Sequence, residues 1–245
     1  MSERLLRTDS NGLCTLTLNR PDKLNALDTE SFEALDIALS SIENDATIGC
    51  VVIRGEGKAF CAGADLKAMS GGPSNIVPSF KPGVIERLAR LPQPTIAAVH
   101  GVCFTGGLEL ALAADFIVAD ATARFADTHG KWGLVGAWGI SQRLPRKIGA
   151  SAAKRMMFTA RIVDAAEAHT LGLIDLLAAS GELSTVLGQF TDEILANSRH
   201  TNVATKRLMR ETDGMSLAEG LAHEHYRYPG LAPDYRDRIA QFSKS

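Results

Sequence analysis

Residues 95–114 hold the pattern that most constrains the fold, because an apolar strand, a glycine turn and a helix follow one another closely. The segment from Thr95 to Val99 is apolar and partly β-branched, which favours a buried strand. The segment from Leu108 to Ala114 is rich in Leu and Ala, which favours a helix. The pair Gly106-Gly107 falls in the first turn of that helix, where free backbone N–H groups and the positive end of the helix dipole can meet a ligand. The stretch therefore predicts an α/β fold with an accessible helix N-terminus.

A carboxylate accompanies these N–H groups. Glu109 lies three residues after Gly106, about one helical turn away. A free N–H donor beside a carboxylate can stabilise an oxyanion while a proton moves. The same residues also fit a glycine turn before a core helix that carries an exposed Glu. From this stretch alone, both interpretations stay open.

Length and charge narrow the class of protein. The chain has 245 residues, enough for one large domain or for a core with a smaller appendage. The formal net charge of −2 gives no electrostatic basis for a nucleic-acid surface, and no apolar run is long enough to cross a bilayer. The first residues contain no apolar signal-peptide core. We therefore expect a soluble, cytoplasmic protein that binds neither nucleic acid nor membrane.

The cysteines and histidines show no ligand pattern. The cysteines lie scattered in apolar segments without a CxxC pair, which favours reduced core thiols over disulfides or metal ligands. The six histidines also lack metal-ligand spacing, so we expect no metal site. The four cysteines are Cys14, Cys50, Cys61 and Cys103.

The rest of the chain alternates strand and helix patterns and then becomes helical. Asp28 is the expected N-cap of the first helix, residues 70–82 are rich in Pro, Gly and Ser and predict a mobile loop, and residues 123–134 form a short irregular segment. Strands are expected over 13–18, 50–53, 116–119 and 173–177, and helices over 29–44, 84–91, 141–148, 151–159, 165–171 and from 184 onward.

Four groups of residues occur in an order and spacing typical of one enzyme family. They are Asn19-Arg20-Pro21 with Leu24-Asn25-Ala26-Leu27; residues 57–66, GKAFCAGADL; residues 95–101 through Gly106-Gly107-Leu108-Glu109-Leu110; and Gln142-Arg143-Leu144-Pro145 with Gly149. On these motifs, which span roughly residues 10–175, the chain resembles the crotonase superfamily, which includes enoyl-CoA hydratases and isomerases.

This resemblance implies the architecture and the assembly. The fold class is α/β, with a crotonase-like spiral of ββα repeats over residues 1–195 and a helical C-terminal trimerisation region over residues 196–245. The expected oligomer is a homotrimer or a hexamer built as a dimer of trimers.

The resemblance also implies an enzyme that acts on an acyl-CoA thioester. The leading interpretation is a 2-enoyl-CoA hydratase, which adds water across the 2,3 double bond through an enolate and needs no cofactor, since CoA belongs to the substrate. By motif position, the backbone N–H groups of Ala64 and Gly106 would hold the thioester oxygen, and Glu109 would be catalytic. Two preorganised donors stabilise such an oxyanion, and the loss of one costs roughly 3–4 kcal/mol in a comparable site.

Other residues match positions that line the substrate or CoA in the family. Lys67 is a candidate contact for a CoA phosphate, and an ordinary solvated lysine explains it equally well. The predicted substrate and CoA contacts are Lys23, Leu24, Ala26, Ala62, Asp65, Leu66, Lys67, Gly107 and Trp132.

The chain departs from the family pattern at one catalytic position, because the second glutamate of typical enoyl-CoA hydratases aligns with His129. Histidine titrates near neutrality and can donate or accept a proton, so Glu109 and His129 are expected to share a water. The competing interpretation is a structural His129 and a lost catalytic group, with Asp127 nearby as a turn or capping residue. An enoyl-CoA isomerase, an acyl-CoA thioester hydrolase that uses Glu109 and His129, and a non-catalytic acyl-CoA-binding protein therefore remain alternatives.

The C-terminal tail keeps only the aromatic and lysine features of the family's last helix. Tyr226, Tyr228 and Lys244 are candidates for a subunit interface, and packing between helices of one chain explains them equally well.

Overall fold

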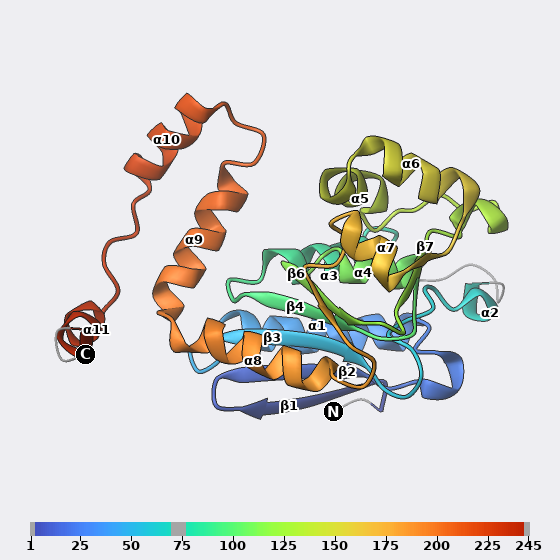
Figure 1. Ribbon diagram of the computed structural model, residues 1–245, viewed down its shortest axis with the longest axis horizontal. Coiled ribbons are helices and arrows are strands. Elements are labelled where there is room, and N and C mark those ends of the chain that lie inside the picture. Colours follow the sequence, from blue (N-terminus) through green and yellow to red (C-terminus); the bar gives the residue numbers. More distant parts are fainter. Residues whose placement is uncertain (1–2, 70–76, 243–245) are drawn as a thin grey trace.

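The structure, a computed structural model, describes residues 3–69 and 77–242 (Figure 1). Part of the predicted loop 70–82 and the predicted interface residue Lys244 lie outside these ranges. The described part of that loop differs from the prediction, because helix α3 (Phe80–Arg90) already begins at Phe80 rather than near residue 84.

The larger sheet has six strands in the order β1-β2-β3-β4-β6-β9, parallel except for β1. Strand β1 (Leu5–Ser10) was not predicted, although Asn11 and Gly12 both have positive φ in a two-residue turn, the geometry that an Asn-Gly pair favours in hairpins. The other strands confirm the predicted ones within a few residues. They are β2 (Leu13–Leu18), β3 (Cys50–Gly55), β4 (Thr95–Val99), β6 (Phe116–Asp120) and β9 (Leu176–Ala178).

Helices cover both faces of this sheet, which explains the continuous apolar runs in its strands. Along β3, Val51 and Ile53 face the main core, whereas Cys50 and Val52 face a second cluster. The main core includes α1 (Thr29–Glu43) and α3, and the second cluster packs against α8 (Leu183–Ala196). The predicted N-cap is confirmed, because the Asp28 carboxylate accepts a hydrogen bond from the Ser31 N–H at 2.9 Å.

The smaller sheet positions the candidate site. It consists of β5 (Val102–Phe104), β7 (Arg124–Ala126) and β8 (Val163–Asp164), with β5 and β7 parallel. Phe104 pairs with Ala126, and an isolated parallel bridge joins Cys61 to Cys103. The residues that follow these three paired segments, 62–64, 105–106 and 127–129, therefore lie close together at one edge of the small sheet. The predicted turn at Gly101 is confirmed, since Gly101 has a positive φ of 54°. Strand β5 directly after it was not predicted, and the segment 123–134, predicted to be irregular, contains β7, because such short strands carry little periodicity.

Short helices follow these strands. Helix α4 (Gly106–Ala111) begins at the predicted glycine pair but ends before Ala114. The predicted helices over 141–148, 151–159 and 165–171 are confirmed within two residues. The remaining helices of the core are α2 (Leu66–Met69), α5 (Ile140–Ile148), α6 (Ala150–Thr159), α7 (Ala165–Thr170) and the 3₁₀ helices η1 (Pro21–Lys23) and η2 (His129–Trp132).

The C-terminal segment is helical, as its pattern predicts, and it leaves the core after α8. Helices α9 (Arg199–Glu211), α10 (Leu217–Tyr226) and α11 (Tyr235–Phe242) extend to one side of the molecule (Figure 1). None of the residues of α10 is buried. The boundary between a spiral core over residues 1–195 and a trimerisation region over residues 196–245 stays a prediction.

The four cysteines are buried free thiols, as predicted. Burial raises the pKa of the Cys61 thiol to about 12, so this thiol stays protonated and unreactive. Among the residues that the structure describes, no helix is long and apolar enough to cross a membrane, and no cluster of His, Cys, Asp and Glu could hold a metal ion.

Candidate active site

A cavity of about 220 Å³ opens where the three segments leave the small sheet. It brings together Ala64, Gly106, Glu109 and His129, four residues that are distant in the sequence. Its other lining residues are Ala62, Leu66, Lys81, Thr105, Thr128, Trp132, Leu134, Val135, Ala137 and Trp138. Most of these side chains are apolar, so the cavity can enclose an acyl group beside a few polar atoms.

The backbone N–H groups of Ala64 and Gly106 lie close together in this cavity. A Cβ atom added to Gly106 would lie 3.2 Å from the Ala64 nitrogen. Leu27 and Ala64 form an isolated parallel β-bridge. In this bridge the Leu27 N–H donates to the Gly63 carbonyl and the Asp65 N–H donates to the Leu27 carbonyl, so the Ala64 N–H points away from Leu27. Neither N–H group has a hydrogen-bond acceptor within residues 3–69 and 77–242. Together they form two open donors at the start of α4.

The residue before Gly106 has a strained backbone. Thr105 has φ +53° and ψ −111°, which a β-branched residue rarely adopts. Its hydroxyl lies 2.5 Å from the Thr128 hydroxyl and accepts a hydrogen bond from the Thr128 N–H at 3.2 Å. These contacts hold the strained turn and tie the start of α4 to the segment that carries His129.

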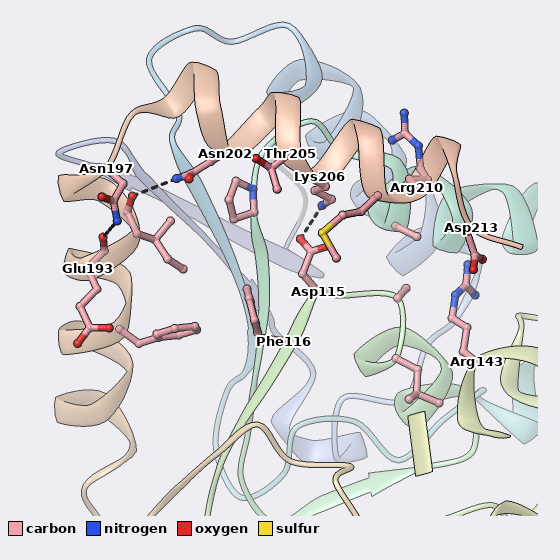
Figure 2. Close-up of a pocket in the computed structure, with 17 residues that line it drawn as sticks. Asp115, Phe116, Arg143, Glu193, Asn197, Asn202, Thr205, Lys206, Arg210 and Asp213 are labelled. Atoms are coloured by element: carbon pink, nitrogen blue, oxygen red, sulfur yellow. Dashed lines mark hydrogen bonds and ion pairs between the residues drawn. The ribbon is translucent and has the colours of Figure 1, made fainter. Parts of the chain in front are cut away.

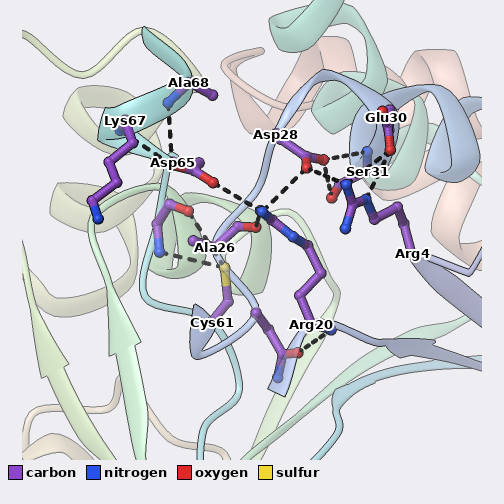
Figure 3. A network of polar contacts seen from close by, with 12 residues as sticks. Arg4, Arg20, Ala26, Asp28, Glu30, Ser31, Cys61, Asp65, Lys67 and Ala68 are labelled. Atoms are coloured by element: carbon purple, nitrogen blue, oxygen red, sulfur yellow. Dashed lines mark hydrogen bonds and ion pairs between the residues drawn. The ribbon is translucent and has the colours of Figure 1, made fainter. Parts of the chain in front are cut away.

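A half-buried ion-pair network holds Asp65, the residue after Ala64 (Figure 3). The Arg20 guanidinium donates to Asp65 at 2.9 Å, lies 3.3 Å from Asp28 and also donates to the Ala26 carbonyl. The other carboxylate oxygen of Asp65 accepts the N–H groups that begin α2. Burial raises the pKa of Asp65, but the bonds from Arg20 and from these N–H groups outweigh it, so the pKa is lowered. The network fixes Asp65, the residue after Ala64.

Glu109 is a buried carboxylate, 1% exposed, which excludes the exposed Glu of the alternative interpretation. One carboxylate oxygen, Oε1, accepts hydrogen bonds from the Trp138 N–H at 2.8 Å and the Ile140 N–H at 3.2 Å. Burial raises the pKa of Glu109, and this effect exceeds the lowering by the two N–H groups and by His129. Glu109 lines the cavity, and its second oxygen, Oε2, is the one close to His129.

His129 lies opposite this second oxygen. Its Nε2 atom is 3.8 Å from Glu109 Oε2, which is too long for a hydrogen bond and suits a water held between the two groups. Its Nδ1 atom lies 2.6 Å from Asp127 Oδ1. Burial lowers the pKa of His129, but the hydrogen bond to Asp127 and the charges of Asp127 and Glu109 outweigh it, so the pKa is raised.

The Trp138 ring forms part of the cavity wall and packs on the buried Phe32 behind it. Trp138 lies against the start of α4, because a Cβ atom on Gly106 would come within 2.3 Å of its ring. The Trp138 ring makes an edge contact with Phe32, at 4.8 Å between ring centroids. The Lys81 ammonium lies 5.7 Å from the centroid of the Phe32 ring. No sequence motif pointed to Lys81.

The predicted contact residues divide into two groups. Ala62, Leu66 and Trp132 line the cavity, as does Trp138, which was not in the predicted set. Gly107 packs on the backbone instead, because a Cβ atom there would lie 2.2 Å from the Cys61 carbonyl oxygen. The other predicted contacts, Lys23, Leu24, Ala26, Asp65 and Lys67, lie outside the cavity lining on η1, α2 and the adjoining turns.

A larger cavity of about 750 Å³ lies between α9 and the core (Figure 2). None of the predicted site residues lines it. Its polar centre is structural, because Lys206 donates to Asp115 at 2.6 Å and to the Gln93 carbonyl at 2.9 Å, which anchors α9 to the end of β4. The smaller cavity is therefore the candidate active site.

Comparison with known proteins identifies the family. A sequence profile described as enoyl-CoA hydratase/isomerase matches residues 8–229. The chain belongs to the enoyl-CoA hydratase/isomerase family. It is 35% identical to a probable enoyl-CoA hydratase of Rhizobium meliloti (99% of this chain, 96% of the relative). It is 31% identical to the 1,2-epoxyphenylacetyl-CoA isomerase of Escherichia coli, with 99% and 96% covered.

A solved structure extends the likeness to the fold. The crystal structure of an enoyl-CoA hydratase from Bacillus anthracis superposes with a TM-score of 0.94 at 30% identity, covering 98% of this chain and 96% of that one. The resemblance to the crotonase superfamily and the crotonase-like α/β fold are thereby confirmed. The chain is an enzyme of the hydratase-like lyase type within the enoyl-CoA hydratase/isomerase family.

Proposed function

We propose that this protein is a 2-enoyl-CoA hydratase. The observation that carries the proposal is the position of Glu109 Oε2 and His129 Nε2, 3.8 Å apart, in the cavity that also contains the open N–H groups of Ala64 and Gly106. Hydration of a conjugated thioester needs these two components, a pair of oxyanion donors and a pair of groups that position and deprotonate water.

The donor pair acts on the thioester. As water adds to Cβ of the enoyl group, electron density moves to the thioester oxygen and forms an enolate. The N–H groups of Ala64 and Gly106 donate to this oxygen, and their interaction strengthens as negative charge develops. Because both donors belong to the backbone and are held by Thr105 and the Arg20 network, little reorganisation accompanies the reaction.

The pair of Glu109 and His129 acts on the water. One group takes a proton from the water while the water oxygen bonds to Cβ. The Cα carbon of the enolate then receives a proton from the pair. The reaction consumes one water and changes no oxidation state of the substrate overall, so it requires no redox cofactor, and CoA enters as part of the substrate. Histidine fits this task because its ring nitrogen exchanges protons near neutral pH.

The CoA moiety is proposed to lie along the turns that flank the cavity. Lys23, Leu24 and Ala26 belong to η1 and the turn after it, and Asp65 and Lys67 lie at the start of α2. Leu24 and Lys67 are exposed, so they can contact a ligand that extends from the cavity to solvent. Asp65 would then act mainly through its bond to Arg20, which fixes the Ala64 turn.

The activity is tested with purified protein and enoyl-CoA esters of increasing chain length, starting with crotonyl-CoA, followed by loss of the conjugated thioester absorbance. A 3-hydroxyacyl-CoA product is expected. A shifted double bond would indicate the isomerase alternative, and free CoA the hydrolase alternative. Binding of the esters without turnover of any would support the non-catalytic alternative and contradict the proposal.

We also propose that residues 196–245 form the subunit contacts of a homotrimer or of a dimer of trimers. Helix α10 has only ten residues and buries none of them, and an isolated helix of this length is marginal in water. Its Leu217 and Leu221 side chains, one turn apart, are 80% and 58% exposed, and Tyr226 and Tyr228, further along the chain, are exposed as well. An apolar surface of this kind indicates a partner, here a second copy of the chain.

Replacing both Leu217 and Leu221 by Glu is expected to dissociate the assembly, because charge at the contact removes the apolar burial that drives it. Light scattering on eluted fractions measures the mass, with Ile37→Glu as the control, since Ile37 is an exposed apolar residue of α1, outside residues 196–245. A wild-type protein that elutes as a monomer would contradict the assignment.

A further inference from the structure

Asp127 makes a contact that a turn residue does not need. Its Oδ1 atom accepts the His129 backbone N–H at 3.1 Å, as the predicted turn role requires, and also lies 2.6 Å from the ring nitrogen Nδ1. The Asp127 side chain is only 3% exposed. A short bond between a buried carboxylate and an imidazole is a strong, charge-assisted interaction.

This bond defines the state of the imidazole. A carboxylate accepts hydrogen bonds, so the ring donates from Nδ1 and the Nε2 atom is left to face Glu109. Without the bond, the ring could turn about its side-chain torsions or carry its proton on Nε2, and Nε2 could then no longer accept a proton from water.

We propose that Asp127 is a positioning residue for proton transfer, which fixes the orientation and tautomer of His129 so that Nε2 exchanges a proton with water held against Glu109. This inference rests on the proposed hydratase function and deepens it. At the position of the family's second glutamate, this chain therefore has a pair, Asp127 and His129. The His129 ring exchanges the proton, and the Asp127 carboxylate holds the ring.

The surroundings of His129 support this assignment. The segment is fixed by the Thr128 contacts to Thr105, and η2 packs against α6. The charged groups that act on the ring are Asp127 and, across the cavity, Glu109. The Lys81 ammonium, from α3, also lines the cavity. Within residues 3–69 and 77–242, the hydrogen bonds of the Asp127 carboxylate both go to His129.

A second aspartate provides a matched control. Asp120 is also buried, and its Oδ1 atom accepts the Thr122 backbone N–H at 2.8 Å, the same two-residue spacing. Its second partner is the Thr122 hydroxyl rather than an imidazole. Substitution of each aspartate by Asn therefore removes a buried charge from a similar turn, but only one substitution affects a ring in the cavity.

The test compares Asp127→Asn, Asp120→Asn and the wild type. Asn keeps an oxygen that can accept both hydrogen bonds, so Asp127→Asn is expected to fold while kcat for crotonyl-CoA falls about 10- to 100-fold with little change in KM. Loss of the negative charge lowers the pKa of His129, so the limb of the pH–rate profile that reports His129 should move to lower pH, whether the ring acts as acid or base.

A second readout requires no turnover. Titration of the His129 ring by NMR is expected to show a lower pKa in Asp127→Asn, because the negative charge is lost. It should also show a mixture of tautomers, because an Asn amide can turn either its oxygen or its NH₂ group toward Nδ1. Asp120→Asn should show no change. If Asp127→Asn matches Asp120→Asn in both the ring titration and kcat, the inference is overturned. Failure of the wild type to hydrate any enoyl-CoA would instead count against the proposed function, and the ring titration would still decide whether Asp127 sets the state of His129.

Discussion

Replacing Glu109 by Gln is expected to lower kcat for hydration of crotonyl-CoA by about 10²- to 10⁴-fold, the contribution of a positioned general acid or base. Gln has the same shape, and its amide oxygen can still accept the N–H groups of Trp138 and Ile140. The amide nitrogen would then stand in the place of Oε2, opposite His129, where it can neither accept nor release the proton of a water.

For Glu109→Gln and the wild type, kcat and KM are measured by turnover, and the affinity for a CoA ester is measured separately by calorimetry. Binding should persist, because Glu109 contributes to the chemical step. The control is Glu167→Gln on α7, which removes the ion pair of Glu167 with Arg161 and should retain full activity. Activity of Glu109→Gln within twofold of the wild type would show that the carboxylate does not take part in the reaction.

Replacing Gly106 by Ala is expected to lower kcat by about 10²- to 10³-fold, as the loss of an oxyanion donor does elsewhere. The added methyl would lie 3.2 Å from the Ala64 nitrogen, so it occupies the space in which the thioester oxygen must sit. It would also lie 2.3 Å from the Trp138 ring, so the ring must move. Gly188→Ala is the matched control, because a methyl there meets no atom within 4 Å.

The ring displacement could by itself unfold the site, so a second variant separates the two effects. Gly106→Ala combined with Trp138→Ala gives the methyl room while it still lies beside Ala64. Thermal unfolding should show stability recovering relative to Gly106→Ala, whereas kcat should stay low. Recovery of kcat together with stability would assign the loss to packing and remove the oxyanion role from Gly106.

The local sequence anticipated those parts of the fold that carry a strong pattern. Strands β3, β4 and β6 are largely apolar runs, and the first helix has an Asp cap, so these elements were predictable, whereas the mostly polar edge strand β1 was not. Strands β5 and β7 have three residues each, too few to show a period, and they became visible only through their pairing. Yet this pairing brings residues 62–64, 105–106 and 127–129 to one edge.

The candidate site was predictable to a similar extent. Motif order pointed to Ala64, Gly106, Glu109 and His129, which the structure brings into one cavity. It did not reveal the hydrogen bonds that Trp138 and Ile140 donate to Glu109, since these cross about thirty residues and depend on the path of a loop. The Asp-x-His spacing was visible, but the 2.6 Å bond of Asp127 to the ring depends on a rotamer that spacing alone does not determine.

Water is expected to add to an enoyl double bond held between the donor pair and the Glu109–His129 pair. Turnover of crotonyl-CoA in water enriched in both deuterium and ¹⁸O, with the product analysed by mass spectrometry, tests this addition most directly. The expected product is 3-hydroxybutyryl-CoA with one solvent oxygen on Cβ and one deuterium on Cα. Free CoA with ¹⁸O in a released carboxylate, or deuterium incorporation without solvent oxygen, would contradict it.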